Sequence, residues 1–166
     1  MITFGIIAAI LIICTLLYLL YVERKRKILE KRNMSFLESI NLTGLPIVSF
    51  VNNDKVVNLV LDTGSNTNII DCEALKSLEH KTSDVKNSVI GIAGQTNESK
   101  YILIPLEYKH KVYDVVCMSA DISQTLSALK EEYGVTVHGL LGTGFFTKYK
   151  YLLDFDEMVA YSKLKD

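Results

Sequence analysis

The chain begins with a long apolar segment. No charged residue occurs between Ile2 and Val22, and about 21 residues at a rise of roughly 1.5 Å each are long enough to cross a hydrocarbon core of about 30 Å. A cleaved signal peptide would need a basic start, a shorter apolar core and a small-residue cleavage site, none of which is present. The pattern therefore predicts a transmembrane helix over residues 1–22.

A basic run follows the apolar segment. ERKRKILEKR, residues 23–32, carries six Lys and Arg side chains, whereas residues 1–22 carry none. The positive-inside rule then places the chain from Glu23 onward in the cytoplasm, as the larger part of a single-pass membrane protein. The run can be a plain solvated helix face, but contact with anionic lipid headgroups of the bilayer is favoured. Residues 23–40 are predicted to form a charged juxtamembrane stalk.

Beyond the stalk the pattern changes to short β-branched runs. LPIVSFV and KVVNLVL flank an Asn-Asn-Asp turn and predict a β-hairpin. Further strand-like runs are TNIID, YILIPLEY, YDVVCMS and VTVHGLLG, NSVIGIAGQTNES has the pattern of a hairpin with a glycine-containing tip, and YLLDF and VAYS form a closing hairpin. Helices are predicted over CEALKSLEH, capped by Asp71, over SQTLSALKEEYG, and over GFFTKYK. Residues 41–166 therefore read as one mostly-β domain with a few short helices.

Charge and cysteine usage exclude some classes of function. Residues 33–166 contain 12 Lys and no Arg against 17 acidic residues, a net charge of −5. Phosphate binding calls for basic patches, so the composition argues against nucleic acid as a partner. The three cysteines and three histidines are dispersed, which predicts no disulfide framework, no metal site and no cofactor.

One carboxylate has an unusual setting. The run NLVLDTGSNTNII, residues 58–70, places Asp62 at the end of an apolar strand and at the start of a Thr-Gly-Ser turn. An unpartnered buried carboxylate is costly, so Asp62 is expected to be either well hydrogen-bonded or chemically employed. A simple turn cap is the plain alternative, because Asp-x-Gly is common in turns.

The surroundings of this turn resemble a known family. LVLDTGS at 59–65, VIGIAG at 89–94 and HGLLGTGFFTKYKYLLDFD at 138–156 are similar to the retropepsin-like aspartic proteases, the single-lobe relatives of pepsin. The resemblance extends over roughly residues 45–162 and implies a membrane-anchored, bacterial-type member. The implied fold is a closed β-barrel with short helices, preceded by one transmembrane helix.

The resemblance also implies roles for individual residues. Asp62 would be catalytic, and the active-site turn would be supported by Thr63, Gly64 and Ser65. As in the pepsin-type turn, the Ser65 hydroxyl would donate to the Asp62 carboxylate. The flap and substrate-binding candidates are Ile90, Gly91, Ile92, Ala93 and Gly94. The residues expected to pack under the active-site loop are Leu140, Leu141 and Gly142.

The chemistry of aspartic proteases adds a requirement. Two carboxylates must share one proton, so that one acts as a base toward water while the other protonates the scissile carbonyl. This chain has one Asp-Thr-Gly, and neither Asp154 nor Asp156 is followed by Thr/Ser-Gly. The site is therefore predicted to form between two identical chains, each donating Asp62 about a two-fold axis. Tethering to one membrane would raise the effective concentration of the two copies.

Three functions are compatible with these observations. The favoured one is a membrane-anchored homodimeric aspartic endopeptidase acting on a peptide or protein substrate. The second is a non-catalytic, protease-like dimeric binding module at the membrane. The third is a membrane subunit whose transmembrane helix is the working part, although that helix lacks the GxxxG pattern of strong helix association.

Overall fold

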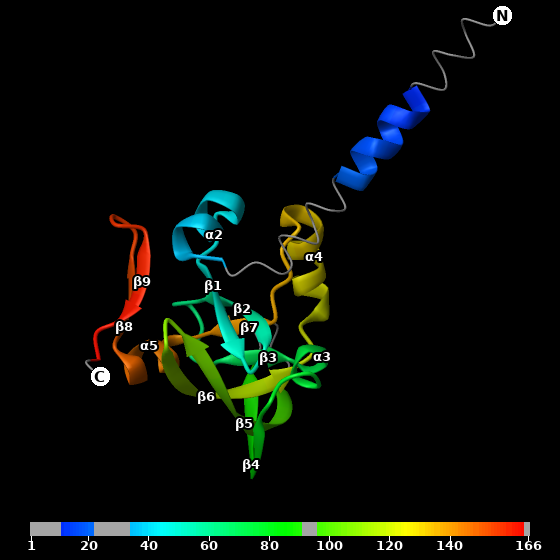
Figure 1. Ribbon diagram of the computed structural model, residues 1–166. Coiled ribbons are helices and arrows are strands. Elements are labelled where there is room, and N and C mark those ends of the chain that lie inside the picture. The colour runs from blue at the N-terminus through cyan, green and yellow to red at the C-terminus, as the bar shows by residue number, and fades with distance from the viewer. Residues whose placement is uncertain (1–10, 22–33, 91–95, 165–166) are drawn as a thin grey trace, which may run out of the picture. The chain divides into compact units, whose positions relative to one another are not determined.

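The computed structural model describes residues 11–21, 34–90 and 96–164, with the backbone alone for residues 84–90 and 96–99 (Figure 1). The chain divides into two compact units, residues 1–32 and residues 33–166. In the first unit, residues 11–21 are helical, and the rest of the predicted span lies outside the described residues. Among the helices described, none has both the length and the apolarity needed to cross a membrane.

The predicted stalk overlaps the second unit. Its residues 23–33 lie outside the described part of the chain. Residues 36–40 instead belong to α2 (Phe36–Thr43), which begins at the cap Ser35 and ends at Gly44 with φ of 69°. The sequence pattern did not reveal that this helix turns an apolar face to the domain, where Phe36 is 2% exposed.

The second unit is a closed β-barrel. Its strands are β1 (Ile47–Asn52), β2 (Lys55–Leu61), β3 (Ile69–Asp71), β4 (Lys81–Ile90), β5 (Thr96–Tyr108), β6 (Lys111–Ala120) and β7 (Gly139–Leu141). The sheet order is β1-β2-β7-β3-β6-β5-β4, and pairing of β1 with β5 closes a ring of six strands. The strand β4 extends the sheet beside β5 (Figure 1). The prediction of a mostly-β closed barrel is confirmed.

The β1–β2 hairpin is buried on both faces, which explains its nearly uninterrupted apolar sequence. Val48 and Phe50 point into the main core. The alternate residue Ile47 packs in a smaller cluster with Val135 and Val137, beneath α4 (Ser123–Tyr133). Each such side chain contributes about 1.5–3 kcal/mol when fully buried.

The remaining elements differ from the predictions mainly in length. Asp71 caps α3 as expected, but the helix is short (Cys72–Leu75) and the chain then enters β4. The strand predicted over 135–142 is reduced to β7, because residues 135 and 137 pack in the smaller cluster. The helix α5 (Thr143–Tyr149) and the hairpin of β8 (Tyr151–Asp154) and β9 (Val159–Ser162) follow as predicted.

Aromatic rings fill the core between β1, β6, α5 and β8. The Phe145 ring lies 5.0 Å from Tyr151, 5.7 Å from Tyr113 and 6.1 Å from Phe50, measured between ring centroids. The Tyr151 hydroxyl is buried, and it has no hydrogen-bond partner in the described part of the chain. Burial also raises the pKa of Tyr151, so this hydroxyl stays neutral.

Replacing Tyr151 by Phe is expected to stabilise the protein. The change Tyr151→Phe removes a buried unpaired hydroxyl, whose desolvation costs about 1–3 kcal/mol, and should raise the free energy of unfolding by about 1 kcal/mol. Urea unfolding of the full chain measures this. The matched change Tyr149→Phe loses a real hydrogen bond, 2.7 Å to the Asp114 carbonyl, and should destabilise. A loss of stability in Tyr151→Phe would contradict the assignment.

Candidate active site

Asp62 follows directly on β2. Its backbone N–H donates to the Leu141 carbonyl at 2.8 Å, which ties the turn to the end of the parallel neighbour β7. The Gly64 N–H donates to Asp62 Oδ1 at 2.8 Å. The other carboxylate oxygen, Oδ2, has no hydrogen-bond partner among the described residues, and the side chain is half-buried. One oxygen is thus fixed by the turn while the other is left for a ligand.

Leu141 and Gly142 lie against this turn, and Leu140 pairs with Val60 of β2 and Ile69 of β3. The Thr143 N–H donates to the Ser65 carbonyl at 2.8 Å, and the Gly142 N–H donates to Asn68 Oδ1, also at 2.8 Å. A Cβ atom at Gly142 would lie 2.6 Å from the Ser65 carbonyl oxygen. The two segments therefore approach more closely than any side chain permits at position 142.

Ser65 does not behave as expected. Its hydroxyl donates to the Thr67 carbonyl at 2.8 Å and accepts from the Thr67 N–H at 3.2 Å. A hydroxyl has one proton to donate, so the expected hydrogen bond from Ser65 to the Asp62 carboxylate is wrong for this structure. The proton is instead donated to a backbone carbonyl two residues further along the same turn, a local hydrogen bond that is common for serine. Thr63 is exposed.

The flap prediction is only partly within the described chain. Ile90 ends β4, where its backbone pairs with Thr96 of β5, so the two strands of the predicted hairpin are present. Gly91, Ile92, Ala93 and Gly94 lie outside the described residues. Their role in substrate binding remains a prediction.

Asp154, one of the two aspartates near the C-terminus, accepts hydrogen bonds from its own turn. Asp154 Oδ1 accepts from the backbone N–H groups of Asp156 and Glu157, at 3.0 and 2.9 Å. This carboxylate closes the turn between β8 and β9, and Asp156 is exposed within that turn. Neither residue is hydrogen-bonded to Asp62 in the described part of the chain.

Two asparagines that support the site were not predicted. Asn68 joins β6 to the residue after β7, because its amide donates to the Val116 carbonyl and its Oδ1 accepts from Gly142. Asn58 is 1% exposed and binds the Ser49 hydroxyl at 2.6 Å and the Thr136 carbonyl at 2.8 Å. The sequence signal for Asn58 was its position as the polar residue of an otherwise apolar run. No sequence signal pointed to Asn68.

His138 directly precedes β7 and is hydrogen-bonded to β2. Its Nδ1 accepts from the Asn58 N–H at 3.0 Å, which requires that this nitrogen carry no proton. Burial lowers the pKa of His138 from its ordinary value of 6.5, and the nearby Asp71 carboxylate offsets part of this effect. The imidazole is thus a structural link beneath the active-site strand.

The lowered pKa of His138 predicts a loss of stability in acid. As pH falls below 6.5, the unfolded chain binds this proton before the folded chain does, so the stability present above that pH is progressively lost. The free energy of unfolding of wild type should therefore fall more steeply between about pH 7.5 and about pH 5 than that of His138→Gln. Urea titrations at several pH values measure both slopes, and equal slopes would contradict the prediction.

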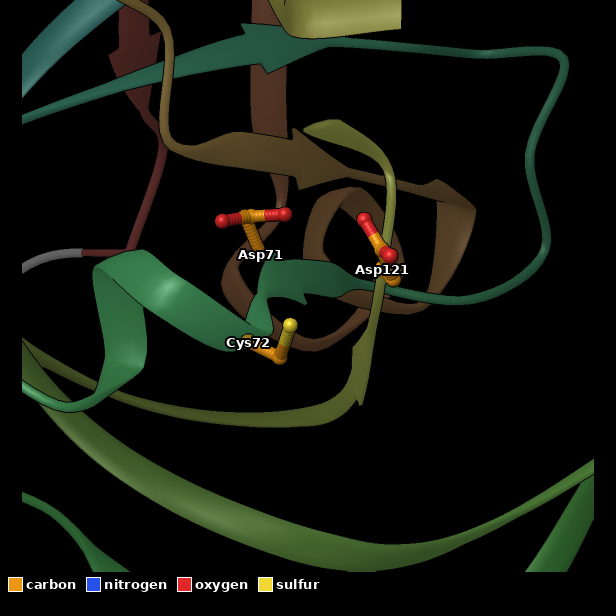
Figure 2. Close-up of side chains that lie close together, drawn as sticks. All are labelled: Asp71, Cys72 and Asp121. Atoms are coloured by element: carbon orange, nitrogen blue, oxygen red, sulfur yellow. The ribbon is translucent and has the colours of Figure 1, made fainter. Parts of the chain in front are cut away.

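A second group of titratable side chains lies at the C-terminal end of β3, where the strand ends at Asp71. Figure 2 shows Asp71, Cys72 and Asp121 close together. Their potential ligand atoms lie within 4.8 Å of one another. Asp71 Oδ2 accepts from the Glu73 and Ala74 N–H groups, and its Oδ1 accepts from the Ile122 N–H. The helix cap accounts for the buried Asp71 carboxylate.

The Asp121 carboxylate in this group likewise accepts hydrogen bonds from a residue close to it in the sequence. The Ser123 hydroxyl donates to its Oδ1 at 2.6 Å, and this contact lowers the pKa of Asp121. Although three such donors can in principle reach one metal ion, each carboxylate here has a structural role at the start of a helix. The group therefore has an explanation without a ligand.

The barrel, the Asp-Thr-Gly-Ser turn and the glycine-bearing segment that supports it define an aspartic-protease type of domain. The chain belongs to the aspartyl protease family, whose model matches residues 48–145. The predicted resemblance is thereby confirmed at the level of the family.

Among the solved structures that are similar to this chain is the EIAV protease complexed with the inhibitor HBY-793. It shares 19% sequence identity with this chain, and the match covers 69% of this chain and 97% of that one, with a TM-score of 0.49. No curated protein matches the sequence.

Proposed function

We propose that this protein is a membrane-anchored aspartic endopeptidase that acts as a homodimer and hydrolyses peptide bonds with water activated between two Asp62 carboxylates. The observation that carries the proposal is the Asp62 carboxylate itself. Its Oδ1 is held by the Gly64 N–H, and Oδ2 is left without a partner among the described residues. The close packing of Gly142 against the Ser65 carbonyl is a second feature. An aspartate that only caps a turn does not require a neighbouring segment to pack so closely against that turn.

The chemistry needs two such carboxylates sharing one proton. The ionised Asp62 of one protomer takes a proton from water as the water oxygen bonds to the scissile carbonyl carbon. The protonated Asp62 of the partner gives its proton to the carbonyl oxygen, producing a tetrahedral diol. The first Asp62, now protonated, then donates its proton to the amide nitrogen, while the partner's Asp62, now ionised, takes a proton from one hydroxyl of the diol. The C–N bond breaks to give a carboxylic acid and an amine, and both carboxylates are back in their starting states. No metal or cofactor takes part in these steps.

Two features support a homodimer. The chain supplies one Asp-Thr-Gly, so the second carboxylate must come from another copy. Outside the barrel, β8 and β9 form a sheet of two strands, and neither has a further partner strand within the described residues. Two-stranded sheets are marginal in water, and a second copy can add strands to this one. Phe155, Val159 and Tyr161 are exposed on this hairpin.

The membrane anchor follows from the uncharged segment between Ile2 and Val22. The basic run at 23–32 favours a cytoplasmic protease domain. A shared membrane would hold two domains on the same side and promote their pairing.

The test is cleavage of a peptide library by the full chain in detergent micelles between about pH 4 and about pH 7, the range in which carboxylate dyads titrate. Cleavage that is blocked by a hydroxyl-containing transition-state mimic supports the enzyme. Adding an equimolar amount of Asp62→Asn to a fixed amount of wild type tests the dimer, since random pairing makes about one quarter of all dimers wild type on both sides and so leaves about half of the original wild-type pairs. Binding of peptides without any cleavage would favour the non-catalytic binding module instead.

A further inference from the structure

A cavity of about 250 Å³ adjoins the active-site turn. Its lining includes residues 66–68 of the loop that continues from Ser65, and Phe145, Lys148 and Tyr149 of α5. Residues 115–118 of β6 also line it. Because the loop and α5 are joined by the hydrogen bond from Thr143 to Ser65, this cavity and the Asp62 turn share one rigid frame.

Among the described residues, the cavity lining carries one positive charge and no negative one. The charged residue is Lys148, and no Asp or Glu of the described chain lines the cavity. Burial raises the pKa of the Cys117 thiol to about 12, and the thiol contacts the Ile102 carbonyl at 3.6 Å. The Tyr149 hydroxyl donates to the Asp114 carbonyl. A ligand carboxylate would therefore meet one cation and no repelling charge.

Hydrogen-bond donors remain for such a ligand. The Lys148 ammonium donates once, to the Asp114 carbonyl at 2.8 Å, and lies 4.9 Å from the Tyr149 ring centroid, so two of its three protons are left. The Asn66 Oδ1 accepts from the Thr67 hydroxyl, while the Asn66 amide nitrogen has no partner in the described part of the chain. The Asn68 amide donates one of its two N–H groups to the Val116 carbonyl, and its oxygen accepts from the Gly142 N–H.

The distance along the chain limits where the ligand group can lie. Asn66 is four residues beyond Asp62, so the two Cα atoms are at most about 14 Å apart. An extended peptide advances about 3.3 Å per residue. A substrate lying over Asp62 therefore reaches the cavity within about four positions of its scissile bond.

We propose that this cavity, bounded by Asn66 and Lys148, binds a carboxylate of the substrate peptide, from an acidic side chain or from its C-terminus, within about four positions of the scissile bond. This inference rests on the proposed function, because it gives the protease a preference among peptides.

The experiment uses the full chain and one peptide that it cleaves. At each position within about four residues of the scissile bond, Glu is compared with Gln, and a free C-terminus is compared with an amide. At one position, or at the C-terminus, wild type should show kcat/KM about threefold higher for the carboxylate form, the size expected for an exposed ion pair. Lys148→Met should reduce this ratio to about one, and Lys148→Arg should restore it.

The matched control is Lys150→Met, at the exposed C-terminal end of the same helix and outside the cavity lining. It should keep the wild-type ratio. A wild-type ratio of one at every position, or a ratio unaffected by Lys148→Met, would overturn the assignment. If wild type cleaves nothing, binding of library peptides in matched Glu and Gln forms, and in free and amidated forms, to the full chain is measured by fluorescence anisotropy. A carboxylate preference lost in Lys148→Met then supports the cavity although the enzyme proposal fails, and equal binding overturns both.

Discussion

Asp62→Asn is expected to lower kcat/KM for peptide cleavage by at least about 10³-fold, because an amide cannot take the proton of the attacking water. The substitution keeps the size of the side chain and leaves an oxygen to accept the Gly64 N–H, now 2.8 Å from Oδ1. The free energy of unfolding should consequently change little. Steady-state cleavage of a fluorogenic peptide and urea unfolding of the same preparations separate catalysis from folding.

Asp154→Asn is the matched control for this experiment. The Asp154 side chain closes the β8–β9 turn by accepting from Asp156 and Glu157, and an asparagine oxygen can accept the same two bonds. Its cleavage rate should stay within about twofold of wild type. Cleavage by Asp62→Asn at the wild-type rate would remove this residue from the mechanism and leave the turn-cap interpretation.

Gly142→Ala is expected to destabilise the protein by about 3 kcal/mol and to reduce activity with it. The added Cβ would lie 2.6 Å from the Ser65 carbonyl oxygen and 2.7 Å from that of Thr67. Both are backbone atoms of the active-site loop, so relief requires moving the loop that carries Asp62. For a domain of this size, the melting temperature should fall by about 10 °C, measurable by differential scanning calorimetry.

Gly144→Ala provides the comparison two residues further on. A Cβ atom there would meet the Asn66 carbonyl oxygen at 3.8 Å, an ordinary contact, and the residue lies in the first turn of α5. Alanine is a better helix former than glycine, so stability should rise by about 0.5–1 kcal/mol. Equal stability of Gly142→Ala and wild type would show that the two segments are not held together as closely as described.

The hairpins were predictable because their signals are local. The Asn-Asn-Asp turn between β1 and β2 and the Lys-His-Lys turn between β5 and β6 separate β-branched runs of matched length. The cap at Asp71 and the stop at Gly134 were also readable, because each depends on one side chain or on one positive φ. The family motif placed Asp62 at a strand end in the same way.

The sequence predicted the length of β7 less well, and it did not predict that α2 packs as part of the domain. Residues 135 and 137 look like strand residues in the sequence, but they pack in a cluster with Met34 and Ile47, about a hundred positions earlier in the chain. The segment 36–40 looks like a charged stalk, yet Phe36 and Ser39 are buried against the barrel. In both cases the deciding partner is distant in sequence.

The sequence by itself determined the apolar and β-branched pattern, the single Asp-Thr-Gly-Ser turn and the excess of acidic residues in the globular part, because these are properties of composition and of neighbouring residues. Tertiary structure alone decided which acceptor receives the Ser65 proton, how closely Gly142 approaches the turn, and that Lys148 and Asn66 face one cavity. Hydrogen bonds and close contacts form between whichever groups the folded chain brings within reach, and that proximity is not written in the spacing of residues.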